Sequence, residues 1–438
     1  MRLTRRNFGA LLGASAALSV TPLAKLVAAG GTARAQSANG FGALAPQLPT
    51  NMASLPANRQ NIAYMALPAA FEYKVVSYAG QIMADGQPVP GAADGMATFA
   101  IGRGRIALVR NHELTTSGTP VTVAGATYDA QVRGGTTSLI VDNEGFLIEQ
   151  YGSLAGTERN CAGGPTPWGT WLTCEETTNI RNGVRHGYVF EVRAQGKSDA
   201  VPLKGLGRFS HEAAAVDPAT GIVYLTEDRG DSLFYRFVPA AYGVLRSPGK
   251  LQALRLVDFE GSVHTVTGLL ELLNQPLAAA WVDIADFDPA GDTTRAEGQS
   301  KGAARFSRGE GCWYGNERIY FVCSDGGNAR AGQVFAYDPA SETLTLVVES
   351  TDRALLDAPD NITIHPDGRL YICEDGGGGD NIVTVDHDGS TSILAKNNWS
   401  DSEWAGACFS EQGHVLFVNM QGDGLTFAIK GPFKRAAR

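Results

Sequence analysis

The chain has 438 residues, of which 44% are hydrophobic and 18% charged, and this is enough apolar material for a large core. Its 53 glycines and 20 prolines are typical of an all-β protein with many turns. The formal net charge of −9 argues against binding to nucleic acid or to an anionic membrane surface, because both repel a polyanion.

The first 35 residues have the pattern of a twin-arginine export signal. Arg5 and Arg6 precede an apolar stretch over 9–24, and Ala33-Arg34-Ala35 matches a small-residue cleavage site. An ordinary secretion signal or a membrane anchor is the alternative, but the stretch is rich in Gly and Ala and short for a span. We therefore expect a periplasmic or secreted protein that meets the twin-arginine translocase and has no stable membrane insertion. Removal of 1–35 takes away five basic residues and no acid, which leaves a net charge of −14.

Residues 36–70 are rich in Ala, Pro and Asn and are predicted to wrap the surface. From 71 to 438, short β-rich runs alternate with turn signals such as Asp217-Pro218 and Asp388-Gly389. The pattern predicts one β domain over 71–438. It also predicts an insertion over about 240–304 and a short helix at 268–275.

One cassette recurs six times in this domain. An acid or its amide opens a run of small and apolar residues, a turn follows, and an apolar strand then stops at a carboxylate or amide. The copies span 93–113, 160–176, 211–228, 308–325, 359–375 and 403–420. Each copy is typical of a β-hairpin, and several intervals match the roughly 40–50 residues of a propeller blade. We predict an all-β, six-bladed β-propeller; a pair of β-sandwiches would leave the repeated acidic ends unexplained.

The inner hairpins of a propeller surround one central channel, so equivalent polar residues should meet at one pole. Not all of them can point inward, because neighbours on a strand face opposite ways. Carboxylates gathered there either raise their pKa values or bind cations, and oxygen ligands favour Ca²⁺. The candidate pole residues are Asp94, Asn111, Glu113, Glu175, Glu176, Glu212, Glu227, Asp228, Glu310, Asp325, Asp360, Asn361, Glu374, Asp375, Glu403 and Asn419.

Two residues depart from the acidic pattern. Cys161 opens the second cassette where the other copies place an acid, and a thiolate suits a transition metal, although an inert buried cysteine is the alternative. Arg308 stands two residues before Glu310, where it could clamp a phosphate or carboxylate or simply neutralise acids. Arg208 and His211 are further substrate-binding candidates with a structural alternative.

Several motifs together resemble the PhoX-type alkaline phosphatases. The resemblance covers most of the chain after the signal, in the same order, with one departure at Gly309, where proline is expected. The motifs are 111–113, 160–176, 207–214, 226–237, 306–311 and 360–376.

The resemblance implies a six-bladed propeller that hydrolyses phosphomonoesters with ferric iron and calcium ions. It also implies that Cys161 ligates iron, that Arg308 holds the substrate phosphate, and that metal ligands come from Glu175 or Glu176, the Glu227–Asp228 pair and Glu310.

We therefore predict an exported, monomeric, metal-dependent phosphatase that uses iron and calcium. The predicted catalytic residues are Arg308 and Glu310, and Arg308, Arg208 and His211 are predicted to bind substrate. The predicted metal ligands are Cys161, Glu113, Glu175, Glu176, Glu212, Glu227, Asp228, Glu310, Asp360, Asn361 and Glu374. A Ca²⁺-dependent propeller lactonase or esterase, which would need neither Cys161 nor Arg308, and a non-catalytic binding propeller remain alternatives.

Overall fold

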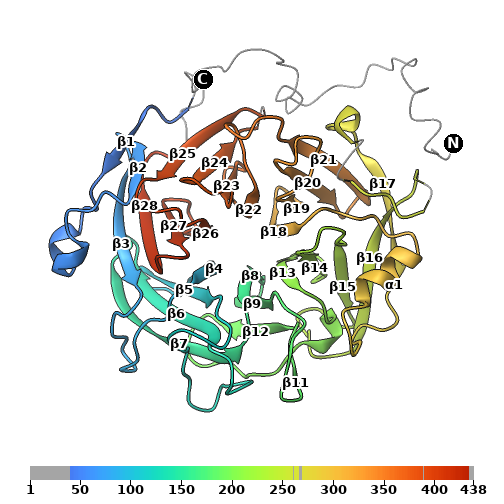
Figure 1. Ribbon diagram of the computed structural model, residues 1–438, viewed down its shortest axis with the longest axis horizontal. Coiled ribbons are helices and arrows are strands. Elements are labelled where there is room, and N and C mark those ends of the chain that lie inside the picture. The colour runs from blue at the N-terminus through green and yellow to red at the C-terminus, as the bar shows by residue number, and fades with distance from the viewer. Residues whose placement is uncertain (1–39, 260, 266–268, 388, 434–438) are drawn as a thin grey trace.

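The computed structural model describes residues 40–259, 261–265, 269–387 and 389–433, and over these ranges the chain forms a β-propeller (Figure 1). The predicted export signal, 1–35, lies outside the described residues. Six inner strands surround the centre, and each packs against its two neighbours in the ring. They are β4 (Ala93–Ala100), β8 (Asn160–Pro165), β13 (His211–Val216), β18 (Gly309–Gly315), β22 (Pro359–Ile364) and β26 (Trp404–Phe409). This confirms the predicted fold.

Each inner strand begins an antiparallel blade that runs outward. The first blade continues through β5 (Arg105–His112), β6 (Gly134–Asp142) and β7 (Leu147–Thr157), and the second through β9 (Thr170–Glu175) and β12 (Val189–Arg193). The third continues through β14 (Val223–Glu227), β15 (Tyr235–Pro239) and β16 (Gly249–Leu256), and the fourth through β19 (Arg318–Cys323), β20 (Gln333–Asp338) and β21 (Thr343–Glu349). The fifth continues through β23 (Leu370–Glu374), β24 (Asn381–Val385) and β25 (Thr391–Asn397), and the sixth through β27 (Val415–Met420), β28 (Leu425–Lys430) and β3 (Glu72–Tyr78).

The blades are not equal. The second has three strands within the described residues and carries a separate hairpin, β10 (Ile180–Arg181) and β11 (Val184–Arg185). β17 (Leu277–Asp283) pairs with both β16 and β21 and joins the third and fourth blades into one nine-stranded sheet. The helical elements are short and lie outside the blades: η2 (Met52–Ser54), η3 (Ala57–Arg59), η4 (Lys204–Leu206), η5 (Leu270–Leu272) and α1 (Thr294–Ser300).

The ring is closed by strands from the two ends of the chain. β3 pairs antiparallel with β28, with Val75 opposite Phe427, so an N-terminal strand forms the outer edge of the last blade. Tyr73 and Phe427 are both buried and lie edge to face, with ring centroids 5.7 Å apart. Burial of these aromatic faces ties the first described strands to the last ones.

The segments outside the cassettes refine the sequence-based expectations. Residues 36–70, predicted to wrap the surface, supply β1 (Leu44–Gln47) and β2 (Met65–Pro68), and β2 pairs with β25 at the edge of the fifth blade. The predicted insertion, 240–304, includes β16, a regular outer strand; the remainder carries β17 and α1. The short helix predicted at 268–275 falls partly outside the described residues, and 270–272 form a single 3₁₀ turn.

Apolar side chains fill the spaces between blades. Phe321 in the fourth blade stacks on Phe234 from the third, with centroids 4.2 Å apart, and on Phe335 at 5.2 Å. Cys323 is buried in the same core as these rings, and Cys174 and Cys373 are buried in two other cores of the propeller. All six cysteines are free thiols. Among the described residues, no helix is long and apolar enough to span a bilayer.

A β-bulge near the start of every inner strand positions the site. The register with the second strand slips after the first residue of the inner strand in five blades, as between Ala93 and Met96, and one residue later, between Ala405 and Cys408, in the sixth. Bulges re-aim side chains and break the ladder locally. In the first five blades, the second residue of the inner strand lies within this irregularity.

Small residues next to the bulges let the inner strands approach one another closely. A Cβ atom on Gly95 would lie 2.6 Å from Cα of Ala162 in the next blade. A Cβ on Gly406, whose φ is +62°, would lie 2.2 Å from the carbonyl oxygen of Asp94. The glycines are therefore required where the ring is narrowest.

Candidate metal centre

The second residue of the inner strand is a potential ligand in five of the six blades. These residues are Asp94, Cys161, Glu212, Glu310 and Asp360, and the sixth blade has Ala405 at the equivalent position. Asp94, Glu212 and Glu310 are only 2% exposed. The ring is therefore acidic around most of its circumference and apolar at one point.

Seven side chains form three overlapping groups that could each hold a cation. The first group is Asp94, Glu113 and Cys161; the second is Cys161, Glu176 and Glu212; the third is Glu212, Glu310 and Asp360. In each group the potential ligand atoms all lie within 4.8 Å of one another. Cys161 is shared by the first two groups and Glu212 by the last two, so neighbouring ions would have common ligands.

Strand alternation decides which acid of each strand end contributes. Glu176 follows β9 and belongs to the cluster, whereas Glu175, the last residue of β9, faces the other way. The Glu175 carboxylate accepts hydrogen bonds from the backbone N–H groups of Glu158 (2.8 Å) and Gly187 (2.8 Å) and from Nδ1 of His186 (2.6 Å). The structure thus places Glu176 in the cluster, whereas the carboxylate of Glu175 holds the neighbouring loops in place.

Glu227 and Glu374 occupy the same outward position as Glu175 in their blades. Oε1 of Glu227 lies 2.6 Å from Nη1 of Arg295, and its Oε2 accepts a bond from the Tyr235 hydroxyl at 3.1 Å. Glu374 accepts the backbone N–H groups of Asp357 (2.9 Å) and Asn381 (3.0 Å). Neither residue belongs to the three groups, so the structure does not bring these two predicted ligands to the centre.

The pKa values of the carboxyl groups in the cluster are higher than those of ordinary carboxyl groups. Burial raises the pKa of Glu176 to about 7 and, together with the nearby Asp228, that of Glu310 to about 8. Burial, followed by repulsion from neighbouring carboxylates, also raises the pKa values of Asp94, Glu212 and Asp360 well above normal. Like charges in a low-dielectric site cannot all ionise unless cations compensate them.

Glu403 is a further acid at this pole, immediately before β26. Burial, followed by repulsion from Asp360 and Asp94, raises its pKa to about 11, and its carboxyl is hydrogen-bonded to that of Asp375. Glu403 and Asp375 were predicted to lie at the pole but were not predicted as ligands. The acidic region therefore extends beyond the three groups toward the fifth and sixth blades.

Two arginines partly neutralise the cluster from equivalent positions, each two residues before the ring residue of its blade. Arg308 pairs in a bidentate fashion with Asp228 through Nε (2.9 Å) and Nη2 (3.1 Å), and its Nη2 lies 3.2 Å from Oε1 of Glu310. Arg159 binds Glu113 at 2.7 Å and also contacts Glu176. Both arginines have left-handed backbone, with φ of +52°. Arg159 was not among the predicted site residues, although the shared Arg-x-ligand spacing in 159–161 and 308–310 could have revealed it.

Arg208 and His211 do not line the centre. The Arg208 guanidinium is buried and donates to the backbone carbonyls of His186 (2.9 Å) and Thr178 (2.5 Å), so it connects loops. His211 donates from Nε2 to the Gly207 carbonyl at 3.0 Å and stacks on Phe209, and burial lowers its pKa to about 3. The contacts of Arg208 and His211 are therefore those of structural residues and not those of substrate-binding residues.

Asn361 lies next to Asp360 in β22 and is 8% exposed. Its amide oxygen is buried and has no hydrogen-bond partner among the described residues. The residue belongs to none of the three groups. Its Cα atom would lie 2.9 Å from a Cβ on Gly311, so the side chain stands where two inner strands meet.

The donor set fits bound metal ions. Carboxylate oxygens favour hard cations such as Ca²⁺, and the thiol of Cys161 adds a ligand that favours a transition metal. Two guanidinium groups cannot compensate all of these carboxyl groups in their ionised form, so the groups keep protons in the absence of cations, and bound cations would allow them to ionise. The residues present therefore suit a centre that combines a hard cation with a transition metal.

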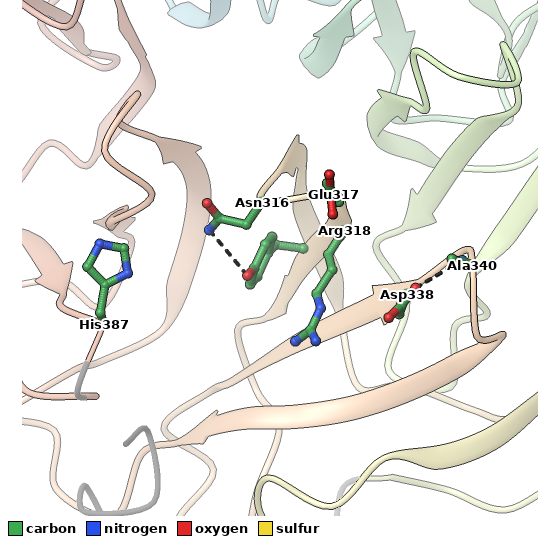
Figure 2. A pocket seen from close by; sticks show the side chains of 7 residues that line it. Asn316, Glu317, Arg318, Asp338, Ala340 and His387 are labelled. Atoms are coloured by element: carbon green, nitrogen blue, oxygen red, sulfur yellow. Dashed lines mark hydrogen bonds between the residues drawn. The ribbon is translucent and has the colours of Figure 1, made fainter. Parts of the chain in front are cut away.

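A shallow pocket lies at the opposite ends of these strands. Figure 2 shows its lining, which includes Asn316, Arg318, Asp338 and His387 around a cavity of about 350 Å³. Asn316 follows the last residue of β18, whereas Glu310 is that strand's second residue, so the pocket and the acidic cluster lie at different poles. Its lining contains none of the cluster residues.

Comparison with known proteins identifies the family. The family model for alkaline phosphatase PhoX matches residues 50–148 and 147–424, which is most of the chain. The structure of Pseudomonas fluorescens PhoX in complex with vanadate, a transition state analogue, has a TM-score of 0.64 and 18% identity, and the match covers 84% of this chain and 96% of that one.

Two more distant structures follow. A protein of unknown function from Bacteroides thetaiotaomicron has a TM-score of 0.46 and 10% identity, over 82% of this chain and 76% of that one. A gluconolactonase from Xanthomonas campestris has a TM-score of 0.39 and 13% identity, over 82% and 94%. No curated protein sequence matches the chain. On the match of the family model, the chain is a phosphatase that belongs to the alkaline phosphatase PhoX family.

Proposed function

We propose that this protein hydrolyses phosphomonoesters at the acidic pole with iron and calcium ions as cofactors. The observation that carries the proposal is the sharing of Cys161 and Glu212 among three ligand groups. Such sharing suits a compact multinuclear centre, and the thiol distinguishes it from a site for calcium alone. The proposed ligands are Asp94, Glu113, Cys161, Glu176, Glu212, Glu310 and Asp360.

Arg308 has the geometry to hold the substrate phosphate. A guanidinium has five N–H donors. Nε and Nη2 of Arg308 are directed to Asp228 and Glu310, while Nη1 has no partner among the described residues and the side chain is 44% exposed. Two N–H groups on one nitrogen therefore remain for phosphoryl oxygens. Asp228 fixes the plane of the guanidinium, which reduces the entropy lost when the substrate binds.

Each residue then has a distinct task. Bound metal ions would supply Lewis-acid activation and a nucleophilic oxygen, so no serine nucleophile is needed. Glu310 holds its carboxylate between the Ser324 hydroxyl (2.6 Å) and Arg308 (3.2 Å), and so links the metal groups to the phosphate clamp. Arg308 would stabilise negative charge that develops on the phosphoryl oxygens.

The test combines metal analysis with two variants. Protein purified without added metal should contain iron and calcium and should hydrolyse p-nitrophenyl phosphate. Cys161→Ala should lose iron, and Arg308→Ala should keep the metals but lose turnover. Glu317→Gln, at the opposite pole, is the matched control and should resemble the wild type. Full phosphatase activity in both test variants would refute the proposal, and calcium alone with lactone hydrolysis would favour the lactonase alternative.

We also propose that the protein acts as a monomer in the periplasm or outside the cell, with 71–438 as its phosphatase domain. Support comes from the arginine pair and the Ala-x-Ala site in 1–35. Replacing Arg5 and Arg6 by lysine should abolish export, as measured by cell fractionation. Light scattering of the purified protein should give the monomer mass of the processed chain, and a dimer mass would contradict the monomer assignment.

A further inference from the structure

Asn111 makes an unusually complete set of hydrogen bonds between two blades. It lies in β5 of the first blade and is fully buried. Nδ2 donates to the backbone carbonyls of Cys161 and Ala162, both at 2.9 Å. Oδ1 accepts from Nε1 of Trp171 at 2.9 Å and from Oγ1 of Thr173 at 2.8 Å. The amide thus uses both donors and both acceptor sites on the second blade.

The bulge in β8 explains why these donors matter. Asn160 pairs with Glu175 and Gly163 with Thr173, so Cys161 and Ala162 stand outside the regular ladder. A buried carbonyl that accepts no hydrogen bond destabilises the folded state, and here each of two consecutive carbonyls needs a donor. Asn111 supplies both bonds from the neighbouring blade and thereby fixes the peptide that carries the Cys161 side chain.

The same position in two other blades also donates to a ring residue. Thr226 in β14 donates from Oγ1 to the carbonyl of Glu310 at 2.5 Å, and Asn419 in β27 donates from Nδ2 to the carbonyl of Asp94 at 2.6 Å. Each donor stands one residue before the end of the second strand of its blade, and each bond reaches the next blade round the ring. Every one of the three ligand groups contains a residue held in this way.

We propose that Asn111 is a positioning residue that sets the place of the Cys161 thiol relative to the other metal ligands. The proposal rests on the proposed role of Cys161 as a ligand. Asn111 does not touch the metal or the substrate; it acts by satisfying the two carbonyls of the bulge. Loss of its donors should let the Cys161 and Ala162 carbonyls turn toward other donors, and this would move the thiol away from Asp94 and Glu113, whose ligand atoms lie within 4.8 Å of it.

A series of variants tests the Nδ2 donors of Asn111 separately from the bonds that its Oδ1 accepts. Asn111→Asp keeps both acceptor bonds, from Trp171 and Thr173, and removes the amide donors. Asn111→Thr offers one hydroxyl donor, as Thr226 does in the third blade. Thr226→Val is the matched control, because it removes the equivalent bond to Glu310, along with the bond that Thr226 accepts from the Ala213 N–H, and leaves both bonds to the Cys161 and Ala162 carbonyls in place. Cys161→Ser defines the signal that depends on the thiol.

The readout is the thiolate-to-cobalt charge-transfer absorbance when Co²⁺ is titrated into metal-stripped protein, alongside circular dichroism to establish folding. We expect the wild type and Thr226→Val to show the band, Asn111→Thr to show it weakened, and Asn111→Asp to bind Co²⁺ about tenfold or more weakly, without most of the band.

A folded Asn111→Asp protein with the wild-type band and affinity would overturn this inference alone. Loss of the band in Thr226→Val to the same extent would overturn it too, since the effect would then be a general loosening of the ring. Absence of the band in the wild type would remove Cys161 from the ligand set and would count against the proposed function as well.

Discussion

Removing the metal ions should make the stability of the propeller fall as pH rises. The perturbation is exhaustive chelation followed by unfolding at pH 5, 7 and 9. Glu310 has a folded-state pKa of about 8 against an ordinary value of 4.5, so the folded state keeps a proton that the unfolded chain loses. A group of this kind stabilises the fold fully below pH 4.5, and the contribution disappears as pH rises through the folded-state value.

The magnitude follows from the size of the pKa change. For Glu310 the difference corresponds to about 5 kcal/mol of folding free energy, and for Glu176, with a pKa of about 7, to about 3 kcal/mol. Glu310 and Glu176 interact with some of the same neighbouring charges, so their contributions to the folding free energy do not add. We expect a total loss of about 5 kcal/mol between pH 5 and pH 9.

Urea unfolding followed by circular dichroism measures this loss. Restoring Ca²⁺ should flatten the pH dependence, because cations replace the protons that the carboxyl groups release. Glu310→Gln is the internal control, since an amide resembles the protonated carboxyl and should show a smaller slope without metal. A metal-free protein whose stability is flat or increases from pH 5 to pH 9 would refute the reasoning.

Other variants separate the roles of neighbouring residues. Arg308→Lys keeps the charge but loses the paired bonds to Asp228, so kcat/KM for p-nitrophenyl phosphate should fall about 10- to 100-fold, and an unchanged value would argue against the clamp. Glu176→Gln should lose bound metal, whereas Glu175→Gln should keep the metal content and lose about 2–3 kcal/mol of stability; equal metal loss in both would contradict the strand alternation. Arg208→Lys should lower the unfolding temperature while KM of the folded enzyme stays constant, and a raised KM would return Arg208 to the substrate site.

The ring of ligands was predictable because the cassette repeats. Equivalent residues of equivalent hairpins must meet at one pole, and Cys161, Glu212, Glu310 and Asp360 do so. The irregularities inside the cassette were harder to foresee. Both Glu175 and Glu176 end an apolar strand, and only the pairing of Asn160 with Glu175 decides which carboxylate faces the centre.

Long-range contacts account for the remaining differences. Arg208 was a reasonable anion ligand by residue type, but loop carbonyls at 186 and 178 surround its guanidinium. Asp94 was a pole candidate that the predicted ligand set omitted, although its position matches that of Cys161 in the next blade. Such assignments depend on the packing of segments far apart in the chain, which local pattern does not contain.

The closure of the last blade by β3 constrains when the metal centre can form. The potential ligands come from residues 94 to 360, and the ring that brings them together is complete only when β28 meets β3. A growing chain can bring together the ligands of adjacent blades before that point, but the three groups are held in one closed ring only after residue 430 has been made. Completion of the full centre is accordingly expected to be coupled to the closure of the propeller.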